Sequence, residues 1–391
     1  MKRKLTRFVQ RALYSALYVS LKYIAVPVAL LAILVIVIPQ ARAGFHTLLF
    51  VAETLDAPVQ PQSWFTREPV RYESVYGSLD GAEVADVYRL SDGKPRAAVL
   101  LSVGAAQKGL DDPAITDFGY ALSRAGFVAM LHWSPPLGRD SDMQPEDPAK
   151  LVRAFEYLAA QDYVAPERTG IGGFSVGGSF AIVAAADERI ADAVRFINAF
   201  GSHYDLETLV VQAASRSVDD DGEQAPWEPH SLTLRILAHE LIETLEDDAE
   251  AELLSGHYVD GEDFAPDALQ ALSERGHTVV RLLDGVSRSE AERLYSTLPQ
   301  DFRDGLAGIS PSNHVEGIRA RLLVMHDRDD RHVPVTESRR LVQAVGEREG
   351  DRYTEFRSFS HTLPGEGNLL DRLAQAFRLS RHMYGLIRIA R

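Results

Sequence analysis

The feature that most restricts the fold of this chain is a regular alternation of apolar runs and helical stretches. The runs Ala97 to Val103 and Phe127 to Trp133 are almost continuously apolar, which is typical of strands covered on both faces. Thr169 to Phe174 and Ala193 to Phe200 follow as two further strands. The helical stretches between these runs are Ile115 to Ala125, Pro148 to Gln161 and Gly177 to Ala186. This order predicts an α/β fold with a parallel sheet and helices on both of its faces.

Further strands are expected on either side of that region. Val70 to Gly77 and Val84 to Leu90 indicate a hairpin, with Asp80-Gly81 in its turn. The strand pattern resumes at Arg321 to Met325, and a helix, a strand and a final helix follow it. We therefore expect a sheet-bearing core made of two pieces, residues 70–201 and 316–391.

Residues 202–315 depart from this pattern and lie between two expected strands. The run Asp219-Asp220-Asp221-Gly222 is a solvated acidic break. Leucines at helical spacing follow it and form one face of an amphipathic helix, namely Leu234, Leu237, Leu241 and Leu245. Because this segment is inserted between strands, we expect it to form a helical cap over a site at the edge of the sheet.

The N-terminal segment, residues 1–43, is basic and apolar and contains no acid. Tyr23 to Pro39 is uncharged, which is near the lower limit for crossing a hydrocarbon core of about 30 Å. Most of the basic residues precede this run and only Arg42 follows it closely, which predicts a single-pass transmembrane helix with a cytoplasmic N-terminus and an extracytoplasmic body. The alternative is a signal peptide cleaved near Ala41-Arg42-Ala43, which would leave a secreted protein. Residues 44–69 read as a connector.

Charge and cysteine content exclude several functions. The 391 residues carry a formal net charge of −15, and because the first 43 hold no acid, the rest of the chain is more acidic still. An acidic body repels phosphates, so no nucleic-acid partner is expected. The lack of cysteine excludes disulfides, thiolate catalysis and cysteine-ligated metals. Composition leaves the oligomeric state open.

A candidate nucleophile stands between an expected strand and an expected helix, in the run Gly173-Phe174-Ser175-Val176-Gly177. In that setting, the glycines permit a turn tight enough to project the serine hydroxyl from the carboxyl edge of the sheet. The amide of Val176 would lie at the helix N-terminus, where it can donate to a developing oxyanion. We predict Ser175 as the nucleophile; the alternative is a glycine-rich turn with an inert serine.

A serine nucleophile needs a base and a carboxylate that orients the base. In such a fold the acid and then the histidine follow the serine along the chain. Asp327, Asp329 and Asp330 compete for the role of acid in the turn after the resumed strand, and we favour Asp330 for its spacing before Val333-Pro334. His361, which lies just past the last expected strand and before the terminal helix, is the predicted base.

Other polar segments receive lesser roles. The loop after the first apolar run should supply the second oxyanion donor, and Ala105 is the best candidate. His326 and His332 lie in the acid loop and are interpreted as loop or substrate-lining residues. The run His239-Glu240-Leu241-Ile242-Glu243 is similar to a zinc-binding helix but lacks a second histidine, so we predict no metal site and no cofactor.

From about Val70 to the C-terminus, the chain resembles the α/β-hydrolase superfamily, in particular its dienelactone-hydrolase-like and related esterase branch. The matching segments are Gly173-Phe174-Ser175-Val176-Gly177-Gly178, Ser310-Pro311-Ser312-Asn313-His314-Val315, Asp330 with Val333-Pro334, and Ser360-His361. The resemblance implies an eight-stranded, mostly parallel sheet and a Ser175–His361–Asp330 triad that acts through an acyl-enzyme. The chain departs from the commoner pattern because Ser102-Val103-Gly104 stands where many members carry His-Gly. Dienelactone hydrolases proper usually employ a cysteine nucleophile, so the activity of that branch need not transfer.

These observations predict a serine hydrolase that cleaves a carboxylic ester or a related small acyl compound. Amide or peptide hydrolysis and acyl transfer to an alcohol use the same triad and remain alternatives. A non-catalytic, hydrolase-like binding protein is a third alternative, since a fold alone does not determine a function.

Overall fold

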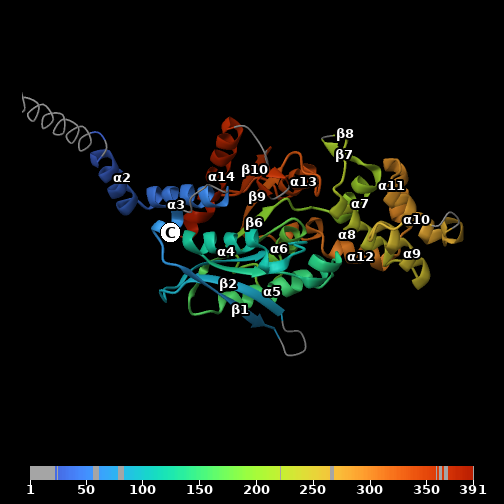
Figure 1. The fold of residues 1–391 in the computed structure, drawn as a ribbon, viewed down its shortest axis with the longest axis horizontal. Helices are drawn as coiled ribbons and strands as arrows, with labels where there is room; N and C mark the ends of the chain where they lie inside the picture. Colours follow the sequence, from blue (N-terminus) through green and yellow to red (C-terminus); the bar gives the residue numbers. More distant parts are fainter. Residues whose placement is uncertain are drawn as a thin grey trace, which may run out of the picture.

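The computed structural model describes residues 23, 25–55, 61–77, 83–220, 222–264, 268–357, 359–360, 363–364 and 369–390. In these parts of the chain, helices lie on both faces of a central sheet, and a further group of helices gathers at one end (Figure 1). His361 lies outside the described residues, as does the expected hairpin turn at Asp80-Gly81.

One eight-stranded sheet forms the centre of the protein, in the order β1-β2-β4-β3-β5-β6-β9-β10. Its strands are β1 (Pro69–Tyr76), β2 (Glu83–Leu90), β3 (Arg96–Ser102), β4 (Val128–His132), β5 (Val164–Phe174), β6 (Phe196–Phe200), β9 (Arg321–Asp327) and β10 (Arg352–Phe356). Strand β2 is antiparallel to both β1 and β4, and all the other neighbouring strands are parallel. The predicted mostly parallel sheet and the predicted first hairpin are confirmed.

Helices cover both faces of this sheet (Figure 1). One face packs against α3 (Pro39–Thr54), α4 (Pro113–Ala125) and α14 (Leu369–Ala390). The opposite face packs against α5 (Asp147–Ala159), α6 (Val176–Ala185) and α13 (Val335–Val345). Because neither face meets solvent at the centre, β4 is buried along its whole length. This burial explains the uninterrupted apolar runs of the sequence.

Local signals set the ends of the helices beside the sheet. The Asp112 carboxylate accepts the Ala114 amide at 2.9 Å and so caps the N-terminus of α4. The same helix ends at Gly126, whose φ of 111° few other residues adopt. Asp205 caps α7 (Leu206–Ser215) in the same way, by accepting the Thr208 amide at 2.8 Å.

A helical insertion follows β6 and ends before β9. Its helices are α7 (Leu206–Ser215), α8 (Ser231–Ile242), α9 (Asp248–Tyr258), α10 (Glu274–Asp284), α11 (Arg288–Ser296) and α12 (Gln300–Gly308). They lie together beyond one end of the sheet (Figure 1). Part of the acidic run that the sequence indicated as a loop belongs to a small hairpin of β7 (Ser217–Asp220) and β8 (Glu223–Pro226). The Asp220 carboxylate forms an ion pair with the Arg339 guanidinium at 2.6 Å, which offsets the negative charge of Asp220.

Short elements complete the described chain. They are the short helices η2 (Pro61–Trp64), η3 (Gly109–Asp111), η4 (Pro136–Asp140), η5 (Ala268–Ala271), η6 (Pro311–Asn313) and η7 (Val315–Gly317), and the strand pair β11 (Phe359–Ser360) and β12 (Leu363–Pro364).

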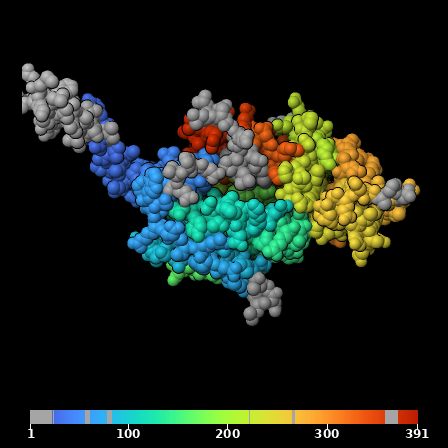
Figure 2. Space-filling model, viewed as in Figure 1, coloured from blue at the N-terminus to red at the C-terminus, as the bar shows by residue number. Residues whose placement is uncertain are grey.

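Helix α2 (Val26–Val37) precedes α3 and projects from the body (Figure 2). Its apolar side chains are exposed, and it meets α3 at an angle of 109°. Among the described residues, no single helix has the length and apolar character needed to cross a membrane, whereas the bent pair of α2 and α3 passes that test together. Helix α3 extends beyond residue 43 into the expected connector because Phe50 and Val51 on its inner face are buried in the core shared with α4 and α14.

Candidate active site

Ser175 lies in a strained turn between β5 and α6. Its φ of 54° and ψ of −135° are rare for a residue other than glycine, and such strain costs about 1–3 kcal/mol. The Ser175 amide donates to the Phe200 carbonyl of β6 at 2.8 Å, and the Ser175 carbonyl accepts the Gly178 amide at 3.0 Å. These bonds hold the turn in place, and the half-buried serine lines a cavity of about 700 Å³.

Close packing of backbone on backbone explains the glycines around this turn. A Cβ atom on Gly173 would lie 2.6 Å from the Gly177 carbonyl oxygen, and a Cβ on Gly177 would lie 2.7 Å from the Gly104 amide nitrogen. Gly104 has a φ of +67°, and a Cβ there would lie 2.6 Å from the Phe174 carbonyl oxygen. Side chains do not approach backbone atoms this closely, so the loop after β3 can rest against the serine turn only with glycine at these positions.

The two predicted oxyanion donors lie on the walls of the same cavity. Val176 is the first residue of α6, so its amide points out of the helix without an acceptor inside it. Ala105 follows Gly104 in the loop after β3, where the Ala106 amide donates to the Gly104 carbonyl at 2.9 Å. Val176, Ala105 and Ser175 all line the cavity.

The loop after β9 holds Asp330 in a defined orientation. This aspartate is buried, and its Oδ1 accepts the amides of His332 at 2.7 Å and Val333 at 3.1 Å. His332 and Val333 line the cavity of Ser175, so the loop reaches the site. The buried Asp327 serves the turn instead, since its Oδ1 accepts the Asp329 amide at 2.8 Å.

Two histidines of this loop occupy the positions expected of loop and lining residues. His326 is fully buried; its Nε2 contacts the Val333 carbonyl at 2.8 Å and its Nδ1 contacts the Ser338 hydroxyl at 2.6 Å. A carbonyl can only accept, so Nε2 carries the proton and Nδ1 accepts from the serine. His332 lines the cavity and stacks on His230 with ring centroids 4.0 Å apart.

Two buried ionisable residues that were not predicted to line the site, His203 and Glu240, lie on the wall of the cavity. Burial lowers the pKa of His203 to about 4, so its imidazole is neutral near pH 7. Its Nε2 has no hydrogen-bond partner among the described residues. A neutral imidazole in this wall can donate to or accept from a bound polar group. His203 follows the apolar run Ala193 to Phe200, which places it at the sheet edge that carries Ser175. This position in the sequence could have marked His203 as a residue of the site.

Glu240 of α8 connects the helical insertion to the loop after β4. Its Oε1 accepts the Met143 amide at 2.7 Å, and Met143 also lines the cavity. Burial raises the pKa of Glu240 to about 8, and the charges of Glu243 and Asp142 add to that shift, whereas the Met143 amide opposes it. The side chain is therefore protonated near pH 7, and the cavity wall carries no charge there.

Replacing Glu240 with Gln should flatten the pH dependence of stability. The unfolded chain releases the Glu240 proton near the ordinary pKa of 4.5, whereas the folded protein keeps it up to about pH 8. Between these two values the folded state binds more protons, so the free energy of unfolding falls as the pH rises. The slope is up to about 1.4 kcal/mol per pH unit. Urea unfolding between about pH 5 and pH 8.5 should show a smaller decrease for Glu240→Gln than for the wild type. Glu252→Gln, an exposed cap residue, is the control, and identical slopes in all three proteins would contradict the prediction.

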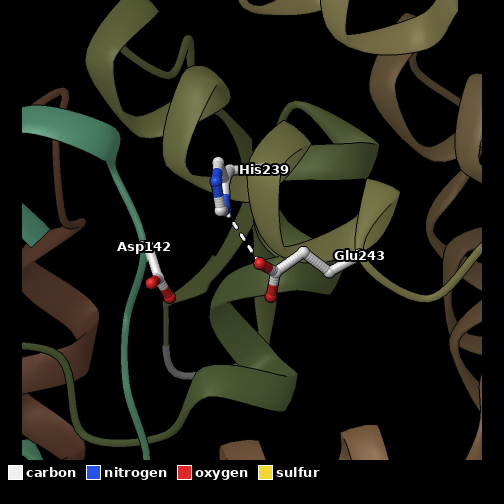
Figure 3. A group of neighbouring side chains, drawn as sticks. All are labelled: Asp142, His239 and Glu243. Atoms are coloured by element: carbon white, nitrogen blue, oxygen red, sulfur yellow. Dashed lines mark ion pairs between the residues drawn. The ribbon is translucent and has the colours of Figure 1, made fainter. Parts of the chain in front are cut away.

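Asp142, His239 and Glu243 come together where the loop after β4 meets α8 (Figure 3). Their potential ligand atoms all lie within 4.8 Å of one another, and His239 Nδ1 is 3.8 Å from Glu243 Oε1. One imidazole and two carboxylates form a donor set that can hold a divalent cation. Asp142 is far from this helix in sequence, and only the tertiary structure brings it to His239 and Glu243. The sequence prediction of no metal site stays a prediction.

Comparisons with known proteins found similar chains among solved structures. No protein-family model and no curated protein matches this chain. Among solved structures, the chain is similar to the esterase domain of a Rhodothermus marinus protein, at 16% identity and a TM-score of 0.43, over 81% of this chain and 98% of that one. It is also similar to the Pyrococcus horikoshii acylaminoacyl peptidase, at 12% identity and a TM-score of 0.46, over 81% of this chain. A puromycin-hydrolysing peptidase from Mycobacterium tuberculosis matches at 15% identity and a TM-score of 0.45, over 82% of this chain.

The chain spans only 41% and 38% of the lengths of those two peptidase chains. The fold is therefore assigned from the features of this chain itself. They are the strand order with β2 antiparallel to its neighbours, the parallel strands that follow, and the strained serine between a strand and a helix. Together these features describe an α/β-hydrolase fold.

Proposed function

We propose that the protein is a serine hydrolase that cleaves a carboxylic ester or a related acyl compound. One observation carries the proposal: the strained Ser175 lines the same cavity as Val176, Ala105 and the loop that holds Asp330. A costly backbone conformation at a serine beside a cavity is typical of a nucleophile that must project from the sheet edge.

In the proposed mechanism, His361 takes the proton of the Ser175 hydroxyl as its oxygen attacks the acyl carbonyl. Asp330 accepts the other ring N–H of His361, which selects the tautomer and stabilises the imidazolium. The amides of Val176 and Ala105 donate to the oxyanion, where each such donor contributes about 3 kcal/mol. His361 returns the proton to the departing alcohol, and water then releases the acyl group by the same steps. No cofactor takes part.

The cavity wall favours an apolar ester over a peptide. Most of its lining is hydrophobic, and the part beside the helical insertion includes Leu206, Val210 and Leu237. The two ionisable groups beside them, His203 and Glu240, are both neutral near pH 7. A peptide would bring unpaired backbone amides into this wall at considerable cost. Amide hydrolysis and acyl transfer remain the alternatives on the same triad.

For its location, we propose a membrane anchor formed by the apolar segment that includes α2, with the cytoplasmic N-terminus and extracytoplasmic body predicted from the basic residues. The exposed apolar side chains of α2 and the bent pair that it forms with α3 support an N-terminal membrane contact. The alternative is removal of this segment as a signal peptide, which would leave the hydrolase free outside the cytoplasm.

A fluorophosphonate probe tests the proposed function, because it reacts with activated serines. The wild type should be labelled, and Ser175→Ala should lose all labelling, since no other residue in this chain is predicted to be activated. Ser312→Ala, which removes a hydroxyl bonded to Asp205 at 2.7 Å, is the control and should be labelled like the wild type. A wild type that is not labelled would favour the non-catalytic binding protein.

The same labelling tests the proposed location. Recovery of full-length labelled protein in the membrane fraction supports the anchor, and a shortened soluble band supports cleavage.

A further inference from the structure

The cavity at Ser175 extends well beyond the cap, and its far part lies beside the helix that continues the N-terminal apolar segment. We propose that this far part receives the hydrocarbon chain of a neutral acyl ester that is drawn from a lipid bilayer. The inference rests on the proposed hydrolysis at Ser175 and names the substrate class of that site.

The far part of the cavity, here the α3 lobe, lies between the sheet and helices α3, α4 and α14. Its apolar wall includes Phe50, Phe118, Ala121, Met325, Leu379 and Met383. The cap lobe, on the other side of the serine, is lined by residues of α7 and α8. An apolar wall of this kind stabilises a bound hydrocarbon in proportion to the apolar surface that binding removes from water. A single cavity of about 700 Å³ therefore offers the reacting centre two apolar arms.

Three carboxylates on the wall of the α3 lobe restrict the charge of the substrate. They belong to Glu53, Asp112 and Asp117. Glu53 pairs with Arg124 at 2.8 Å, and Asp112 is engaged in capping α4. The Arg124 guanidinium offsets the charge of Glu53, so the carboxylates of Asp112 and Asp117 are the groups that repel an anionic headgroup or a fatty-acid anion at this wall. This repulsion favours an uncharged ester and the release of the acid product.

The surface around the α3 lobe indicates where the ester comes from. Large apolar side chains are exposed on α2, and also at Leu48 of α3, Trp64 of η2, the adjoining Phe65, and Leu373 and Phe377 of α14. Phe377 is 70% exposed and Trp64 is 68% exposed. Helices α2, α14 and η2 all pack against α3, and α3 supplies Phe50 to the lobe. Exposed apolar groups that cluster on adjoining elements are typical of a membrane-contacting surface.

A pair of matched substitutions tests where the acyl chain lies. Ala121 in the α3 lobe and Ala213 in the cap lobe are both 1% exposed, and both line the cavity. In full-length protein, Ala121→Phe should lower turnover of 4-methylumbelliferyl oleate at least about tenfold and leave turnover of the acetate ester within about twofold. Ala213→Phe should not lower the ratio of oleate to acetate turnover. If Ala213→Phe lowers the ratio of oleate to acetate turnover and Ala121→Phe does not, the acyl chain lies in the cap lobe and the proposal is wrong.

Two further measurements keep the test decisive. Ala121→Phe could lose acetate turnover because it lowers the melting temperature of the protein. In that case the smaller substitution Ala121→Val must still lower the ratio of oleate to acetate turnover. An unchanged ratio in Ala121→Val overturns the proposal that the acyl chain lies in the α3 lobe. Loss of acetate turnover in Ser175→Ala is required by the proposed function alone. If Ser175→Ala keeps that turnover, the proposed function fails independently of the lobe.

The bilayer source is tested with phosphatidylcholine vesicles that contain the oleate ester. The double variant Leu373→Ser, Phe377→Ser should turn over the vesicle-borne ester at least about fivefold more slowly, with unchanged turnover of soluble acetate ester, because less apolar surface meets the bilayer. Leu269→Ser, at an exposed leucine of the cap, is the matched control and should behave like the wild type. Equal rates for both variants would show that the ester is taken from solution and would overturn the membrane source.

Discussion

Asp330→Asn is expected to lower kcat/KM for an ester by about 10⁴-fold, the size of loss that follows when a triad acid loses its charge. Asn keeps an oxygen that can accept the amides of His332 and Val333, so the loop should retain its shape. Because Asp330 Oδ2 lies 3.4 Å from His326 Nε2, an NH₂ group at that position should also cost some stability. The other oxygen becomes an NH₂ group, which cannot accept the ring N–H of His361 and so favours the wrong tautomer. Steady-state kinetics, together with urea unfolding to show that the fold persists, measure the effect.

The neighbouring aspartates provide the controls for this prediction. Asp329→Asn changes an exposed side chain and should alter kcat/KM by less than about threefold. Asp327→Asn retains the oxygen that accepts the Asp329 amide at 2.8 Å, so it should cost some stability and little activity. If Asp327→Asn shows the larger loss of activity, Asp327 is the acid, and the present assignment is wrong.

Gly177→Ala is expected to damage both stability and catalysis. The added methyl would lie 2.7 Å from the Gly104 amide nitrogen and 2.7 Å from the Ser102 carbonyl oxygen, so the loop after β3 must move away from the serine turn. Overpacking of this kind costs about 1–3 kcal/mol of unfolding free energy. Displacing the Ala105 amide from the oxyanion should further lower kcat by about 10²–10³-fold. Urea unfolding and ester kinetics measure the two effects.

Gly305→Ala is the matched control, because this glycine lies inside α12 and a Cβ there meets nothing within 4 Å. That variant should gain about 0.5–1 kcal/mol of unfolding free energy, since alanine loses less conformational freedom in a helix than glycine. Its activity should be unchanged. If Gly177→Ala behaved like Gly305→Ala, the tight contact between the β3 loop and the serine turn would not be required for function.

The strands and the serine turn could be predicted from sequence because their signals are local. Strand β4 is buried along its whole length, so almost every residue in it is apolar, and the run can be recognised without a partner. The turn at Ser175 needs glycines where backbone meets backbone, and those glycines stand beside the serine in the chain. Asp330 was favoured from its spacing to Val333, and the structure shows a carboxylate bonded to the Val333 amide. Its catalytic role, like that of His361, stays a prediction.

The sequence by itself determined the α/β architecture, the motif around Ser175 and an apolar N-terminal segment. Only the tertiary structure decided which distant side chains share the cavity. Burial by the surrounding fold makes His203 and Glu240 neutral, and no local pattern encodes that burial. The packing of α3 against α4 and α14 places Phe50 on the wall of the cavity, whereas its position in the chain indicated a connector. Ionisation and cavity shape depend on contacts between segments far apart in sequence, which periodicity and spacing do not record.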